Sequence, residues 1–168
     1  MPEKQTLRRA RMDLQEGKSP STAAGEFVRE EIEHVREGKH GARSPQQAIA
    51  IGLSKARRSG IPLPPPKHGK MKATIRRSAD QDYQKGQSGE EHKPSRPASQ
   101  ARKVVLAREP RSTASHKSLS NQSRSAGRRR SSQQRHRSAV LAVQTKGKEG
   151  LRLAAKKGAR TRAHQGGA

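Results

Sequence analysis

The chain has 168 residues, of which 27% are hydrophobic and 1% aromatic. It carries 38 Lys and Arg against 14 Asp and Glu, a formal net charge of +24, and it has no cysteine. This composition excludes a large apolar core, because too little apolar area is available to offset the ordering entropy of every residue. It also excludes disulfides and cysteine-based metal or thiol chemistry, and the charge favours a polyanionic partner.

The charge is divided unevenly along the chain. Residues 1–60 carry twelve Lys and Arg and eight Asp and Glu, whereas residues 61–168 carry twenty-six and six, which gives net charges of +4 and +20. The two parts meet at residues 61–66 (IPLPPP), a stiff segment that cannot continue a helix. We therefore predict a small helical module over residues 1–62, followed by a Pro-rich hinge and a basic tail over residues 63–168.

Two helices are predicted before residue 38. The first covers residues 3–16, where leucines and alanine recur at helical spacing, and it ends at Gly17. The second covers residues 20–37 and begins at Ser19-Pro20, which supplies an N-cap and a first-turn proline. One apolar stripe of this second helix consists of Ala24, Phe27, Val28, Ile32 and Val35.

The third helix, over residues 44–58, has the clearest local signals. Ser44 as N-cap, with Gln47 three residues later, fits a capping box. Gly60 followed by Ile61 is typical of a helix end at which the apolar residue folds back onto the last turn. Its small residues would let another helix approach closely. We predict a face for a protein partner or for self-association from Phe27, Val28, Ile32, Ile49 and Leu53.

Beyond residue 66 the sequence predicts disorder. Residues 67–100 show no hydrophobic period, and residues 111–138 are low-complexity Ser, Arg and Gln. Residues 151–157 have the composition of a nascent helix, interrupted by nearby glycines. The predicted fold class is mostly α: two or three short N-terminal helices in a hairpin or small bundle, then a long disordered basic tail.

No enzyme and no cofactor is predicted. The chain lacks a Gly-x-Ser-x-Gly elbow, and Met12 stands where a phosphate-binding loop ending at Gly17-Lys-Ser19 would need glycine. The histidines at positions 34, 40, 68, 92, 116, 136 and 164 show no paired spacing typical of a metal site and are expected to face solvent.

The basic tail suits sequence-independent contact with phosphates. Tyr83 is its one tyrosine, so stacking of single-stranded bases is not expected to contribute much. We interpret the chain as a non-specific DNA- or RNA-associated protein; alternatively, residues 19–62 are a protein-interaction module and the tail is a solubilising spacer. The predicted phosphate contacts are Lys39, Arg43, Lys55, Arg57, Arg58, Arg76, Arg77, Arg128, Arg129, Arg130, Arg135, Arg137, Lys156 and Lys157.

Residues 25–34 (GEFVREEIEH) and 37–58 (EGKHGARSPQQAIAIGLSKARR) resemble a family of small basic bacterial proteins defined only as a domain of unknown function. The resemblance covers about residues 1–66. It implies a bacterial cytoplasmic protein, and because the family has no established activity it assigns no functional residues. The longest apolar runs are far shorter than the roughly 20 residues of a spanning helix, so we expect a cytoplasmic location, extended to the nucleoid if the protein binds DNA.

Overall fold

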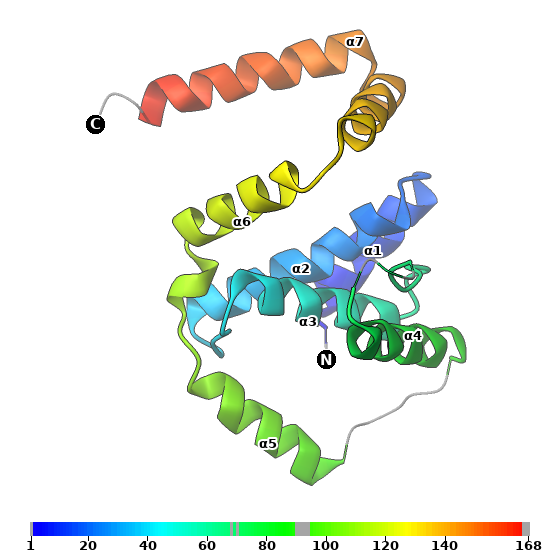
Figure 1. Cartoon of the computed structure of the whole chain (residues 1–168), viewed down its shortest axis with the longest axis vertical. Coiled ribbons are helices and arrows are strands. Elements are labelled where there is room, and N and C mark those ends of the chain that lie inside the picture. Colours follow the sequence, from blue (N-terminus) through cyan, green and yellow to red (C-terminus); the bar gives the residue numbers. More distant parts are fainter. Residues whose placement is uncertain (1, 68, 70, 90–94, 166–168) are drawn as a thin grey trace. The chain divides into compact units, whose positions relative to one another are not determined.

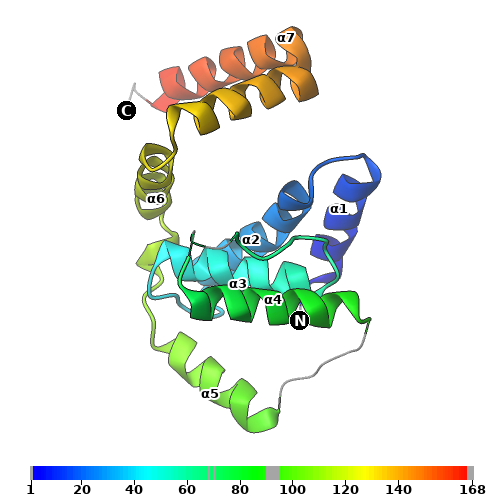
Figure 2. The same ribbon diagram turned by 45° about the vertical axis from the view of Figure 1, so that its right-hand side comes forward.

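The structure is a computed structural model that describes residues 2–67, 69, 71–89 and 95–165. In these residues it contains seven α-helices, one short 3₁₀ helix and no strand (Figures 1 and 2). The prediction of a mostly α-helical protein is confirmed. The chain divides into two compact units, residues 1–122 and 123–168, and each is described by itself. None of the described helices combines the length and apolarity that crossing a bilayer requires.

The first three helices occupy the segments for which the sequence predicts them. The hydroxyl of Ser19 accepts a hydrogen bond from the Thr22 amide at 3.4 Å, and that of Ser44 accepts one from the Gln47 amide at 3.2 Å. Each serine is followed by a first-turn proline, so both helices begin with the same local arrangement. The helices are α1 (Lys4–Gln15), α2 (Pro20–Glu37) and α3 (Pro45–Arg58).

The end of α3 follows the predicted geometry. Gly60 has a φ of 83°, in the left-handed region, and the Ile61 amide donates to the Ala56 carbonyl at 3.2 Å. Ile61 is buried and packs in the same apolar cluster as Ala56. The expected contact of Ile61 with the last turn of the helix is confirmed.

The core of the first unit is built largely from alanine. Eight of the eleven buried hydrophobic residues in the described chain are alanines, which explains how so hydrophilic a sequence packs helices together. One cluster joins α1, α2 and α3 around Phe27, and a second lies around Val35. The other buried members are Ala10, Ala23, Ala24, Ala56 and Ile61 in the first cluster, and Ala42, Ala48 and Ala114 in the second.

Gly52 lets α3 approach α2 closely. A Cβ atom built at Gly52 would lie 2.7 Å from the Cα atom of Val28 and 3.0 Å from the carbonyl oxygen of Phe27. The close helix approach that the small residues of α3 predict is therefore made within the chain, to α2.

The prediction of a disordered tail is wrong. Arg, Ala, Lys and Gln, which are frequent beyond residue 66, all have high helix propensity, so low hydrophobicity does not prevent helix formation there. The helical elements of this region are α4 (Ala73–Gln87), α5 (Arg96–Ala107), the 3₁₀ helix η1 (Ser112–Ala114), α6 (His116–Arg128) and α7 (Ser132–Gln165).

Helix α4 packs against α3 (Figure 2). Asp82 on α4 accepts a hydrogen bond from the Ser54 hydroxyl at 2.5 Å and pairs with Arg58 at 3.1 Å. Gly86 lies so close to the Arg57 carbonyl that a side chain at this position would clash with it. These contacts attach part of the predicted tail to the N-terminal helices.

The segment between α5 and α6 covers the loop that joins α2 to α3. The Gly41 amide donates to the Leu106 carbonyl at 2.8 Å, and the Ala42 amide donates to the Pro110 carbonyl at 3.2 Å. Ala114 of η1 is buried in the cluster around Val35. The tail therefore completes part of the core.

The second unit consists of the end of α6 and all of α7. Gly147 has non-helical torsion angles (φ 66°, ψ 171°), and α7 bends sharply there, as Figure 1 shows. Among the glycines near residues 151–157, Gly147 interrupts the helix as expected, whereas Gly150 and Gly158 lie within it. No described residue of this unit is buried, so its helices are stabilised locally rather than by a core.

Candidate functional site

The fourteen predicted phosphate contacts divide equally between the two units. Seven lie in the first unit, between the end of α2 and α4: Lys39, Arg43, Lys55, Arg57, Arg58, Arg76 and Arg77. Seven lie in the second unit: Arg128, Arg129, Arg130, Arg135, Arg137, Lys156 and Lys157.

Several cations of the first unit are engaged by neighbouring groups of the protein. The ammonium of Lys55 lies 2.5 Å from Oε2 of the buried Glu31. Arg57 is 7% exposed and donates to the Leu63 carbonyl at 3.2 Å, and burial lowers the pKa of its guanidinium. Arg58 pairs with Asp82 of α4, as described above. These three side chains are therefore already engaged in contacts within the protein.

The other four predicted phosphate contacts of the first unit are Lys39, Arg43, Arg76 and Arg77. Lys39 is exposed but pairs with Glu37 at 3.0 Å. Arg43 and Arg77 are exposed and Arg76 is half-buried, and none of the three forms an ion pair with a described residue. They are dispersed over the α2–α3 loop and α4.

The second unit carries many positively charged side chains and almost no negatively charged ones. Residues 123–168 contain thirteen Lys and Arg and one acidic residue, Glu149. All thirteen cations are exposed. Within the described part of this unit Arg152 is the one cation in an ion pair, 3.9 Å from Glu149, and twelve cations have no carboxylate partner.

Part of this charge forms a stripe along the second half of α7. Lys148, Arg152, Lys156 and Arg160 follow one another at four-residue spacing, so they lie on neighbouring turns of one helix face. At 1.5 Å per residue the stripe is about 18 Å long.

The face predicted to bind a protein partner is directed inward. Phe27 is fully buried between α1, α2 and α3, and Leu53 packs against the same cluster. Ile32 packs against the cluster around Val35, and the backbone of Val28 lies against Gly52 of α3. Like Val28, Ile32 and Leu53, Ile49 is half-buried.

A polar cluster that the sequence analysis did not indicate lies where α2 ends. Glu31, His34 and His40 each offer a donor atom within 4.8 Å of the other two. The His40 Nε2 atom lies 3.2 Å from Glu31 Oε1, and His40 Nδ1 lies 3.0 Å from the Gly41 carbonyl oxygen. Glu31 is 1% exposed.

A second buried carboxylate adjoins the cluster. Glu30 is 3% exposed, and the Lys55 ammonium lies 3.6 Å from its Oε1 atom. Neither Glu30 Oε1 nor Glu31 Oε2 accepts a hydrogen bond of good geometry from any described residue, although both lie near Lys55. One lysine ammonium thus lies against two buried carboxylates.

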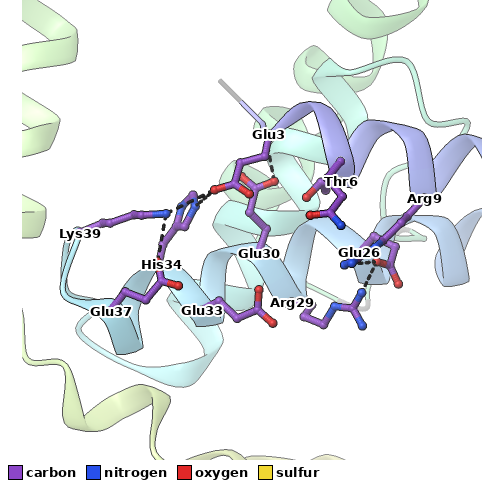
Figure 3. A pocket seen from close by; sticks show the side chains of 11 residues that line it. Glu3, Thr6, Arg9, Glu26, Arg29, Glu30, Glu33, His34, Glu37 and Lys39 are labelled. Carbon is purple, nitrogen blue, oxygen red and sulfur yellow. Dashed lines mark hydrogen bonds and ion pairs between the residues drawn. The ribbon is translucent and has the colours of Figure 1, made fainter.

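A pocket between α1 and α2 is lined by Glu30 and His34 of this region and by Glu3 from the start of the chain (Figure 3). The Glu3 amide donates to Glu30 Oε2 at 3.1 Å, and the Glu3 carboxylate lies 3.0 Å from His34 Nε2 and 3.3 Å from the Lys39 ammonium. The hydrogen bonds from His34 and Lys39 lower the pKa of the Glu3 carboxyl. Polar contacts therefore attach the first turn of α1 to the last turns of α2.

Two of the histidines expected to face solvent are largely covered, since the side chains of His34 and His40 are 13% and 18% exposed. The usable sequence signal was the spacing of Glu31 and His34, three residues apart on one helix face, with His40 just after a glycine stop. Exposure is as expected at positions 116, 136 and 164, while positions 68 and 92 lie outside the described residues.

Comparison with known proteins confirms the resemblance to a domain of unknown function. Residues 16–68 match the model of a family described as "Family of unknown function (DUF6496)". The match begins just after α1 and covers all of α2 and α3 and the proline segment, and so includes Glu31, His34, His40 and Lys55. No curated protein and no solved structure matches the chain.

Proposed function

We propose that the protein binds nucleic acid without sequence specificity through the basic helices of its second unit. The observation that carries the proposal is the set of twelve exposed cations of the second unit that have no carboxylate partner among the described residues. A cation already paired within the protein gains little from a phosphate, whereas an unpaired one releases a condensed counterion when it binds.

The helical form of this unit supports the proposal. A helix fixes cations at regular intervals, so the stripe of Lys148, Arg152, Lys156 and Arg160 presents four charges along about 18 Å without further ordering of the backbone. Duplex DNA carries about one phosphate charge per 1.7 Å of its axis, so several phosphates lie within reach of such a stripe. No base-specific readout is proposed.

A salt titration of the full chain on a fluorescent 20-base-pair duplex tests the proposal. If about eight phosphates are neutralised, the logarithm of the association constant falls with the logarithm of salt concentration with a slope of about −7. The variant K148Q/K156Q/R160Q, which keeps good helix formers, should give a slope shallower by about 2.7.

The matched control is K4Q/R8Q/R11Q, which removes three exposed charges from α1 and should change the slope little. Equal slopes for the two triple variants would show that net charge alone governs binding. Affinity that does not depend on salt would contradict the proposal outright.

A further inference from the structure

Three potential metal donors converge at the end of α2. Glu31 and His34 lie on one face of the helix, and Gly38, with a φ of 78°, reverses the chain so that His40 returns to that face. In a tetrahedral zinc site with bonds of about 2.0–2.1 Å, donors are about 3.3 Å apart. Glu31 Oε1 and His40 Nε2, at 3.2 Å, already have this separation.

The hydrogen bond that His40 makes through Nδ1 leaves its Nε2 atom available to bind a metal ion. The Gly41 carbonyl oxygen only accepts, so the proton of their 3.0 Å hydrogen bond must be on Nδ1. Nε2 is then left to face the Glu31 carboxylate, which also only accepts. Two lone pairs 3.2 Å apart repel unless a cation lies between them, either a second proton on the imidazole or a metal ion. A backbone carbonyl on the remote nitrogen is also what orients many metal-bound histidines.

The balance of charge in the cluster favours an added cation. Glu30 and Glu31 are both buried, and among the described residues Lys55 is the one lysine that pairs with them. Buried carboxylates are costly unless they are paired, and here two share one ammonium, while Glu30 Oε1 and Glu31 Oε2 accept no hydrogen bond of good geometry from a described residue. Lys55 lies on Oε2 of Glu31, which leaves Oε1 for a second cation on the side of His40.

We propose that Glu31, His34 and His40 bind one divalent transition-metal ion, and that Zn²⁺ is the ion that best fits. Two imidazoles and one carboxylate disfavour Mg²⁺ and Ca²⁺, which prefer oxygen ligands, and they form a known zinc donor set that leaves a fourth position for water. Glu3, 3.0 Å from His34 Nε2, would orient the second histidine.

The bound ion would fasten the loop between α2 and α3 to the helix. Through Gly41 and Ala42 this loop holds the segment between α5 and α6, so its position affects a large part of the first unit. The site is independent of the proposed nucleic-acid surface, and neither proposal depends on the other.

The test uses the full chain without a polyhistidine tag, treated with chelator and then titrated with ZnCl₂ by calorimetry. We expect one ion per chain and an increase of about 5 °C or more in the melting temperature at saturating metal. Co²⁺ should give the visible absorption of a four-coordinate site. His34→Ala and His40→Ala should each lower Zn²⁺ affinity at least about tenfold, and the double variant should abolish binding.

His136→Ala, which removes an exposed histidine from α7, is the matched control and should bind as the wild type does. If an alanine variant loses helicity, the corresponding glutamine variant, which keeps the polar bulk, is measured instead. The proposal is overturned if the wild-type chain binds no Zn²⁺ or Co²⁺, or if binding survives the double variant.

Discussion

At the scale of single residues, the interior of this protein is unusual in what it buries. Phe27, Glu31 and Val35 are the largest fully buried side chains, so a carboxylate occupies a place that an apolar residue normally takes. Removing one partner of a buried pair leaves an uncompensated charge, which typically costs about 3–5 kcal/mol. The Lys55 ammonium is therefore a structural group of the fold.

Gly52 offers a sharp test of the packing of α2 on α3. In Gly52→Ala the new Cβ would lie 2.7 Å from the Val28 Cα atom, and backbone atoms cannot move aside as a flexible side chain can. The two helices must separate, at a cost of about 1–3 kcal/mol in the free energy of unfolding. Chemical denaturation followed by circular dichroism measures the change.

The control for this substitution is Gly25→Ala on α2. Gly25 is exposed, and a Cβ there meets no atom within 4 Å. Alanine should therefore stabilise the helix by about 0.5–1 kcal/mol through its higher helix propensity. Two glycine-to-alanine changes on facing helices are thus expected to have opposite signs, and a neutral or stabilising Gly52→Ala would contradict the close approach.

At the scale of helices, capping and stop residues predict the helix boundaries correctly where the helix between them also has an apolar period. Ser19-Pro20, Ser44 with Gln47, and Gly60 with Ile61 each predict a helix boundary, and the structure has these boundaries. The composition of the tail predicts disorder, but the tail also contains helix-capping residues. The backbone amide of Ser131 donates to Gln134 Oε1 at 3.1 Å, and the Gln134 amide donates to the Ser131 hydroxyl at 3.2 Å, which is a complete capping box at the start of α7.

The polar cluster could be predicted only in part. The spacing of Glu31 and His34 on one face is a property of the sequence, but the return of His40 depends on the turn at Gly38 and on the cover supplied by Leu106 and Pro110. That cover comes from residues more than sixty positions away in the chain. No periodicity within the helix carries this information.

The capping box of α7 yields a prediction at the same scale. Ser131→Ala removes the acceptor for the Gln134 amide, and such a loss typically costs about 0.5–2 kcal/mol of helix stability. Because none of the described side chains of the second unit is buried and able to compensate, the loss should appear as faster amide exchange at the start of α7. Nuclear magnetic resonance measures it residue by residue.

Ser138→Ala provides the comparison within the same helix. The Ser138 hydroxyl donates to the Gln134 carbonyl at 3.0 Å, a back-bond that contributes little to a helix, and alanine has the higher propensity. In this variant, amide exchange at the start of α7 should slow or stay unchanged. If amide exchange accelerates equally in the two variants, the capping box does not determine where α7 begins.

At the scale of the whole molecule, the two units carry equal net charge by different means. Residues 1–122 have twenty-five Lys and Arg and thirteen Asp and Glu, and residues 123–168 have thirteen and one, so each unit has a net charge of +12. In the first unit many cations are paired, among them Lys18, Lys39, Lys55 and Arg58. In the second the same net charge is spread over 46 residues and is almost unpaired.

A chain truncated after Gln122 tests whether DNA binding depends on net charge or on the cations that lack a carboxylate partner. It retains the contacts among α1, α2, α3, α4 and η1, so it should keep a cooperative thermal transition close to that of the full chain. Its affinity for duplex DNA at about 0.1 M salt should fall at least tenfold, with a shallower salt slope, because the unpaired cations are lost. Melting by circular dichroism and a salt titration by fluorescence anisotropy measure the two properties on one sample. Binding as tight as that of the full chain, by a truncated protein that still melts cooperatively, would place the interface on the first unit and exclude the second.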